Sequence, residues 1–256
     1  NIYKLYMDEK QKKIWITGAS SGIGKAVATK FAQEGWKVAV SARRKELLDD
    51  LAKNPNIFSF PLDVTKKSQV DSVFQDILKN FGDLDICLFS SGTYDPKTEQ
   101  KIDPEKIKNV INVNFFGVVD CVKSVEDHFK NKRSGQISIV SSIASYRGLP
   151  NSSGYGPSKA ALTNFSESIY FDFKKYNVRI SLISPGFIKT PLTDKNEFPM
   201  PFLRSPEFAA QKIYQGLVNS NSFEIHFPKQ LTFTLKFLRI LPYKIYLFLV
   251  DKLVKR

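Results

Sequence analysis

Residues 17–24 read Thr-Gly-Ala-Ser-Ser-Gly-Ile-Gly and decide the fold of this chain. They follow an apolar run at 13–17 and open a segment in which Ile23, Val27 and Phe31 recur at helical spacing. Glycines between a strand and a helix permit a tight turn, close packing of the two elements and a close backbone approach to a pyrophosphate. The helix start adds unpaired N–H groups and a partial positive charge, which attract phosphate. The segment therefore predicts a nucleotide-binding strand–loop–helix unit, with a purely structural turn as the alternative.

Short apolar runs and longer helical segments alternate almost to the end of the 256 residues. The runs with strand character are 13–17, 37–41, 57–61, 86–90, 136–140, 179–184 and 223–227. Strands that alternate with helices indicate βαβ units and a parallel sheet. We expect an α/β protein with a Rossmann-like, doubly wound parallel seven-stranded sheet. One catalytic, nucleotide-binding domain spans 1–227, and a helical C-terminal extension spans 228–256.

Cysteine and histidine content limits the chemistry. Cys87 lies in an apolar run and Cys121 in a helical stretch, so we interpret both as buried free thiols rather than a redox pair. His128 and His226 are too few and too far apart to form a metal-ligand cluster. No secretory signal precedes the first motif. We expect no metal and a reducing, cytoplasmic compartment.

The end of the second strand bears on cofactor preference. NAD sites usually carry Asp or Glu there, about 20 residues past the glycines, to hold the ribose 2′-OH. Ala42 occupies that place, and Arg43 and Arg44 follow it. A guanidinium can bind a 2′-phosphate that a carboxylate would repel. NADP(H) is therefore favoured, with Arg43 as the first candidate and Arg44 as the second; a solvated arginine pair is the alternative.

Tyr155 and Lys159 have the spacing Tyr-x-x-x-Lys, which places both side chains on one helix face. The spacing alone selects nothing, because two other pairs share it: Tyr6/Lys10 and Tyr170/Lys174. Tyr155 differs from the other two tyrosines in the residues that are expected to lie near it. Ser142 follows the strand at 136–140, and Pro185-Gly186 follows the strand at 179–184. Parallel strands bring their carboxyl ends to one edge of the sheet, so these groups are predicted to converge.

Together these motifs resemble the short-chain dehydrogenase/reductase superfamily, from about Lys13 to about Phe227. The resemblance implies hydride transfer between a nicotinamide cofactor and a carbonyl or alcohol, and a homodimer or homotetramer. It implies four catalytic residues: Asn114, Ser142, Tyr155 and Lys159. It also implies a set of cofactor contacts, to which the two arginines are added: Gly18, Ser20, Ser21, Gly22, Ile23, Gly24, Arg43, Arg44, Asp63, Val64, Gly92, Tyr155, Lys159, Pro185, Gly186, Ile188 and Thr190.

The expected chemistry pairs hydride transfer with proton transfer at the substrate oxygen. A tyrosine with a pKa of about 10 is a reluctant base. We expect the Lys159 ammonium, helped by the positive nicotinamide in the oxidised complex, to lower the pKa of Tyr155. Tyr155 would then act as acid in reduction and base in oxidation, while Ser142 would hydrogen-bond the developing alkoxide. The family pattern implies that Asn114 holds a water linking Lys159 to solvent, and that Lys159 bonds the nicotinamide ribose.

The chain departs from the family pattern at two places. Residues 89–92 read Phe-Ser-Ser-Gly where the family commonly has Asn-Asn-Ala-Gly. We expect altered local stability there rather than lost activity, because serines supply fewer hydrogen bonds than asparagine amides. Pro157 interrupts the catalytic motif, and it is tolerated if it lies in the first helical turn.

The last 29 residues have a different character. They hold seven basic residues and one acidic residue, and so contribute +6 to the chain's net charge of +13. Two apolar segments, 231–241 and 245–250, are interrupted by basic residues and are too short to span a bilayer. They are predicted to form helices that lie on the inner face of a membrane, or that pack in the core or against another subunit. Nucleic acid is disfavoured, because no recognition pattern accompanies the charge.

An apolar segment at 193–206 falls where the family's variable substrate lid lies. Its aromatic side chains suit a hydrophobic substrate. We therefore expect an NADP(H)-dependent enzyme acting on a hydrophobic or lipid-like ketone or aldehyde. Two alternatives remain: an NAD(H)-linked alcohol dehydrogenase, and a non-catalytic nucleotide-sensing protein on the same fold.

Overall fold

The computed structural model describes residues 11–97 and 99–254. At its centre is a parallel seven-stranded sheet with the order β3-β2-β1-β4-β5-β6-β7. Chain direction across the sheet reverses between β1 and β4, which is the switch point of a doubly wound fold. The predicted fold is confirmed, and strand ends differ from the predicted runs by at most two residues. The strands are β1 (Lys13–Thr17), β2 (Lys37–Ser41), β3 (Ile57–Ser59), β4 (Ile86–Phe89), β5 (Gln136–Val140), β6 (Arg179–Pro185) and β7 (Glu224–Phe227).

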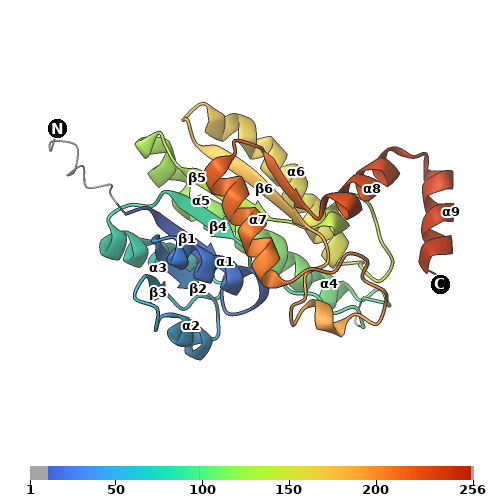
Figure 1. The fold of residues 1–256 in the computed structure, drawn as a ribbon, viewed down its shortest axis with the longest axis horizontal. Helices are drawn as coiled ribbons and strands as arrows, with labels where there is room; N and C mark the ends of the chain where they lie inside the picture. The colour runs from blue at the N-terminus through green and yellow to red at the C-terminus, as the bar shows by residue number, and fades with distance from the viewer. Residues whose placement is uncertain (1–10, 98, 255–256) are drawn as a thin grey trace, which may run out of the picture.

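Helices cover both faces of this sheet (Figure 1). Buried residues of α1, α2 and α7 belong to the core on one face, and those of α3, α5 and α6 to the core on the other. The α-helices are α1 (Gly22–Gln33), α2 (Lys45–Leu51), α3 (Lys67–Phe81), α4 (Pro104–Ile111), α5 (Gly117–Lys132), α6 (Tyr155–Lys174), α7 (Pro206–Asn219), α8 (Lys229–Ile240) and α9 (Tyr243–Val254). A π-helical turn, η1 (Asn112–Phe116), and two 3₁₀ turns, η2 (Ile143–Ser145) and η3 (Thr193–Lys195), complete the set.

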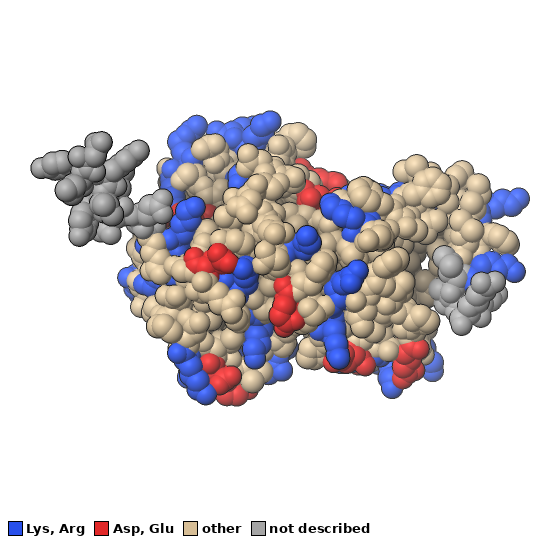
Figure 2. Space-filling model, viewed as in Figure 1, with Lys and Arg blue, Asp and Glu red and all other residues tan. Residues whose placement is uncertain are grey.

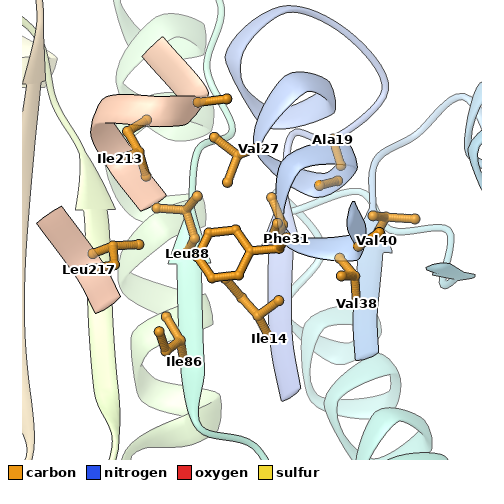
Figure 3. Packing of buried hydrophobic residues seen from close by; sticks show 14 of the residues in the cluster. Ile14, Ala19, Val27, Phe31, Val38, Val40, Ile86, Leu88, Ile213 and Leu217 are labelled. Carbon is orange, nitrogen blue, oxygen red and sulfur yellow. The ribbon is translucent and has the colours of Figure 1, made fainter. Parts of the chain in front are cut away.

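Phe31 is central to the core on the α1–α7 face (Figure 3). Its fully buried ring lies against Trp36 and Tyr214, with ring centroids 5.0 Å away in each case. Ile14 of β1 belongs to the same core, whereas the neighbouring Trp15 packs into the core on the opposite face. Side chains that alternate between two apolar cores explain why the strands are continuous hydrophobic runs. This buried sheet provides a fixed edge for the loops that form the site.

The helical extension is confirmed as α8 and α9, which project from one end of the sheet (Figure 1). Arg147 anchors α8 and α9 to the rest of the protein. Its guanidinium donates to the carbonyl oxygens of Leu238, Arg239 and Leu241, at 3.1, 3.2 and 2.7 Å. It also lies 4.1 Å from the centre of the Tyr246 ring. Residues 229–254 are called the C-terminal arm below; their separation as a unit from 1–227 stays a prediction.

Candidate active site

A cleft of about 670 Å³ opens at the carboxyl edge of the sheet. Ser142 and every residue expected to contact the cofactor line it. These residues come from the loops that follow β1 to β6 and from the first turns of α1 and α6. Asn114 is the exception, because it is fully buried and does not line the cleft. Segments far apart in the sequence thus converge at the sheet's switch point.

The glycines of the phosphate loop have no room for side chains. A Cβ on Gly18 would lie 2.7 Å from the Ser90 carbonyl oxygen, and the φ of Gly18 is +69°. A Cβ on Gly24 would lie 2.4 Å from the Gly18 carbonyl oxygen. The loop therefore packs directly on the end of β4, and α1 begins at Gly22 facing the cleft. A bare backbone at a helix N-terminus fits the pyrophosphate of a dinucleotide.

The two arginines after β2 both line the cleft but differ in their contacts. The Arg44 guanidinium donates to the hydroxyls of Ser20 and Ser21, at 2.9 and 3.2 Å. Arg43 faces Asp63 instead. Burial raises the pKa of Asp63, but hydrogen bonds from Thr65 and the charge of Arg43 outweigh burial and hold it below its usual value. One guanidinium thus contacts the phosphate loop, and the charge of the other acts on Asp63, beyond the end of β3.

Tyr155 and Lys159 lie on the first turns of α6, next to the end of β5. The Lys159 ammonium is buried, donates to the Val140 carbonyl oxygen at 2.9 Å and lies 5.7 Å from the centre of the Tyr155 ring. Burial lowers the pKa of Lys159 to about 8. Ser142 is held at the start of η2, where its hydroxyl accepts the Ala144 N–H at 3.2 Å. Pro157 lies in the first turn of α6, as expected.

The protein's own groups raise the pKa of Tyr155, and Lys159 is not among the groups that lower it. Burial raises the pKa of its phenol, the Ser142 hydrogen bond lowers it, and the charge of Glu99 raises it further. Desolvation disfavours the charged form of any buried group, so a phenolate is costly here. The Lys159 ammonium, which was expected to offset this cost, points to the Val140 carbonyl oxygen. The phenol therefore retains its proton to higher pH than a free tyrosine.

Asn114 occupies the π-helical turn η1, a feature that is frequent at functional sites. Its amide oxygen accepts the Thr93 N–H at 2.7 Å, and its amide nitrogen donates to the Thr93 carbonyl and the Ser158 hydroxyl, each at 3.0 Å. Asn114 thereby braces the chain after β4, where the family's own asparagines are missing. A Cβ on Gly92 would lie 3.6 Å from both the Asn114 amide oxygen and the Lys159 ammonium. The water-holding role of Asn114 stays a prediction.

Comparison with known proteins agrees with this geometry. Residues 12–199 match the family model described as short chain dehydrogenase. The chain belongs to this family. An uncharacterized oxidoreductase of Myxococcus xanthus is 32% identical over 232 residues, which cover 89% of this chain and 91% of the relative. A Thermotoga maritima protein named 3-oxoacyl-[acyl-carrier-protein] reductase FabG is 32% identical over 213 residues, 77% of this chain and 87% of the relative.

Among solved structures, ElxO with NADP bound superposes with a TM-score of 0.73 at 27% identity. The match covers 84% of this chain and 97% of that one. The chain is therefore an oxidoreductase of the short-chain dehydrogenase family, whose cofactor class is a nicotinamide nucleotide. Within the described residues, no group of three His, Cys, Asp or Glu side chains is placed to hold a metal, and both cysteines are buried free thiols.

The Tyr170/Lys174 pair of this short-chain dehydrogenase does not line the cleft. Lys174 lies 5.8 Å from the centre of the Tyr170 ring, much like the pair at the site. The Tyr170 ring, however, packs on Phe171 and Phe223 and does not line the cleft. Tyr6/Lys10 falls outside the described residues. Helical spacing alone therefore does not identify the site.

Sequence reasoning missed two residues beside Tyr155. The Tyr94 ring lies 4.8 Å from the Tyr155 ring, and burial, followed by the charges near it, raises the pKa of Tyr94 to about 12. Glu99 is 5% exposed and accepts the backbone N–H groups of Gly154 and Tyr155. Both residues belong to the irregular loop between β4 and α4, which has no periodicity. No sequence signal pointed to either of them.

Proposed function

We propose that this short-chain dehydrogenase uses NADP(H) to reduce a hydrophobic ketone or aldehyde. The observation that carries the proposal is the convergence of Ser142, Tyr155 and Lys159 on the cleft that also holds the phosphate loop. A protein that only senses a nucleotide has no use for a complete proton-transfer set at its cleft. The nucleotide-sensing alternative therefore has less support than catalysis.

Each side chain has a defined role in this proposal. The bound cofactor supplies the hydride. The Tyr155 phenol donates its proton to the substrate oxygen, while the Ser142 hydroxyl hydrogen-bonds the same oxygen as negative charge develops there. Lys159, with a pKa of about 8, is largely protonated at neutral pH and can bond the nicotinamide ribose. The raised pKa of Tyr155 keeps the phenol in the form that reduction requires.

The preference for NADP(H) rests on the end of β2. Ala42 offers no carboxylate to a ribose 2′-OH, and Arg43 and Arg44 both line the cleft beside it. A 2′-phosphate would gain charge-assisted hydrogen bonds from either guanidinium. The NADP-bound ElxO neighbour supports the same choice.

The preference for a hydrophobic substrate rests on the segment at 193–206 and on a relative. Leu192, just before this segment, lines the cleft together with Thr193 and Lys195 of the segment. Phe198 packs on Phe187 with ring centroids 6.0 Å apart. Phe202 and Leu203 are exposed on the same segment. The Thermotoga maritima relative is named for a 3-oxoacyl group, a carbonyl on an acyl chain.

Steady-state reduction of a series of aldehydes and 2-alkanones of increasing length tests this proposal. We expect NADPH to be the better cofactor, and kcat/KM to rise about fourfold for each methylene that becomes buried. Faster turnover with NADH would favour the NAD(H)-linked alcohol dehydrogenase. NADPH binding without turnover of any carbonyl would favour the nucleotide-sensing protein.

We also propose that the C-terminal arm docks on an anionic membrane surface, at the inner face. On α8, Phe233, Phe237 and Ile240 form one stripe and are 60%, 61% and 76% exposed. On α9, Leu247 and Phe248 are exposed to a similar extent. Exposed aromatic and aliphatic stripes on amphipathic helices are typical of membrane-interface binding. None of the helices in the described part of the chain is both long and apolar enough to cross a bilayer.

The charge of the arm favours lipid over a second copy of the arm. Its basic side chains outnumber its one acidic residue: Lys229, Lys236, Arg239, Lys244 and Lys252 against Asp251. Figure 2 shows the arm as a projection of mostly uncharged surface flanked by lysine and arginine. Pairing two such arms would bring like charges together, whereas anionic headgroups complement them. The homodimer or homotetramer implied by the family remains a prediction.

Flotation of the full chain with vesicles tests the membrane proposal. We expect binding to phosphatidylglycerol vesicles that weakens with salt, and little binding to phosphatidylcholine. Phe237→Ser with Phe248→Ser should abolish flotation, whereas Phe171→Ser, at a 67% exposed position on α6, should not. Failure of the folded full chain to float would overturn the proposal. A dimer that the double variant loses would show instead that the arm binds a second subunit.

A further inference from the structure

Glu99 is a buried acidic residue for which the proposed reaction has no role. It lies in the loop between β4 and α4 and is 5% exposed. One carboxylate oxygen accepts the Gly154 N–H at 3.0 Å, and both accept the Tyr155 N–H, at 3.1 and 3.0 Å. An ionised carboxyl group only accepts hydrogen bonds, and these partners only donate. The contacts therefore suit a charged carboxylate.

The carboxylate replaces a cap that α6 lacks. Gly154 occupies the N-cap position and has no side chain with which to cap the helix. The first N–H groups of a helix have no partner within it, and unpaired buried N–H groups are costly. Glu99, 55 residues earlier in the chain, supplies the acceptor and places a negative charge at the positive end of the helix. Tyr155 is the first residue of this helix, so the same contacts fix its backbone.

We propose that Glu99 is a positioning residue that fixes Tyr155 at the cleft by accepting the first backbone N–H groups of α6. The inference rests on the proposed carbonyl reduction, in which Tyr155 donates the proton. A displacement of the first turn of α6 would move the phenol away from Ser142, and errors of about 1 Å in such geometry cost on the order of 100-fold in rate. The charge of Glu99 adds to the burial that raises the pKa of Tyr155 and so favours the protonated phenol, the form that reduction requires.

Electrostatics around the phenol determine the sign of the expected pH effect. Of the described residues, Lys159 faces Tyr155 from α6, and Tyr94 and Glu99 face it from the loop. Burial is the main cause that raises the pKa of Tyr155, and the charge of Glu99 adds to it. Removal of that charge must lower the pKa of Tyr155. Reduction needs the protonated phenol. In a variant without the Glu99 charge, the alkaline decrease in reduction rate must therefore begin at a lower pH than in the wild type.

Glu99→Gln and Glu99→Ala separate charge from hydrogen bonding. Gln removes the charge but keeps one acceptor oxygen, whereas Ala removes both. We expect Ala to lower kcat by about tenfold or more with little change in the KM for NADPH. We expect Gln to lower kcat less and to move the alkaline limb of kcat/KM to lower pH. Glu105→Gln is the matched control, because Glu105 is an exposed carboxylate on the first turn of α4.

A titration without substrate distinguishes this inference from the proposed function. Protein carrying 3-fluorotyrosine, whose phenol is intrinsically more acidic, allows ¹⁹F NMR titration, with the Tyr155 signal assigned by its loss in Tyr155→Phe. We expect the Tyr155 midpoint to fall in Glu99→Gln and to stay unchanged in Glu105→Gln. An unchanged midpoint and pH profile in folded Glu99→Gln would overturn the role of Glu99, whatever the wild type reduces. A lowered midpoint in a wild type that reduces no carbonyl would instead count against the proposed function alone.

Discussion

Tyr155→Phe is expected to lower kcat/KM for carbonyl reduction by about 10²–10⁴-fold, because it removes the proton donor while the ring stays in place. The Tyr94 ring, 4.8 Å away, still has an aromatic partner in the variant. NADPH affinity should therefore change little, since Lys159 and the phosphate loop are untouched. Stopped-flow or steady-state oxidation of NADPH, with binding measured separately by fluorescence, checks both parts.

Tyr170→Phe is the control for this prediction. Tyr170 precedes Lys174 by the same four residues, and the lysine lies 5.8 Å from its ring centre. It packs on Phe223 outside the cleft, so its variant should retain wild-type kcat/KM. Equal activity of Tyr155→Phe and Tyr170→Phe would contradict the assignment of the proton donor.

The double substitution Ala42→Asp, Arg43→Ala is expected to reverse cofactor preference. Loss of a charge-assisted hydrogen bond of about 1.5–3 kcal/mol weakens NADPH binding roughly 10- to 150-fold. The new carboxylate repels the 2′-phosphate further and accepts a hydrogen bond from the 2′-OH of NADH. Dissociation constants for the two cofactors, measured by calorimetry, should therefore change in opposite directions.

Lys45→Asp is the matched control for charge. Lys45 follows the arginine pair directly, is exposed on α2 and does not line the cleft. Its variant changes the net charge by the same amount as the double substitution and should keep wild-type selectivity. If it weakened NADPH binding as strongly as the double substitution, only the general positive field would matter, and the assignment of Arg43 would be wrong.

Local patterns predicted much of the architecture. The apolar runs became strands because the inner strands of the sheet are buried on both faces, as Ile14 and Trp15 show by packing into opposite cores. The pattern misplaced the ends of some strands, such as β3, because the end of a strand depends on its pairing. β3 lies at the edge of the sheet, where it pairs with β2. The two C-terminal helices followed from apolar spacing, but their attachment did not. Arg147 anchors them from a loop about 90 residues away in the chain.

Residues at strand ends could also be predicted, because parallel strands must deliver their loops to one edge. The contacts of Asn114 with Thr93 and Ser158 could not be predicted, since hydrogen-bond partners depend on three-dimensional packing.

The sequence by itself therefore determined the fold, the family and the residues that gather at the cleft, since these follow from periodicity, glycine geometry and spacing along single elements. Only the tertiary structure decided the electrostatics of the site. Glu99 reaches Tyr155 from an irregular loop, and burial with this charge raises a pKa that Lys159 was expected to lower. Burial and through-space charge depend on which segments meet in the fold, and no local pattern records them.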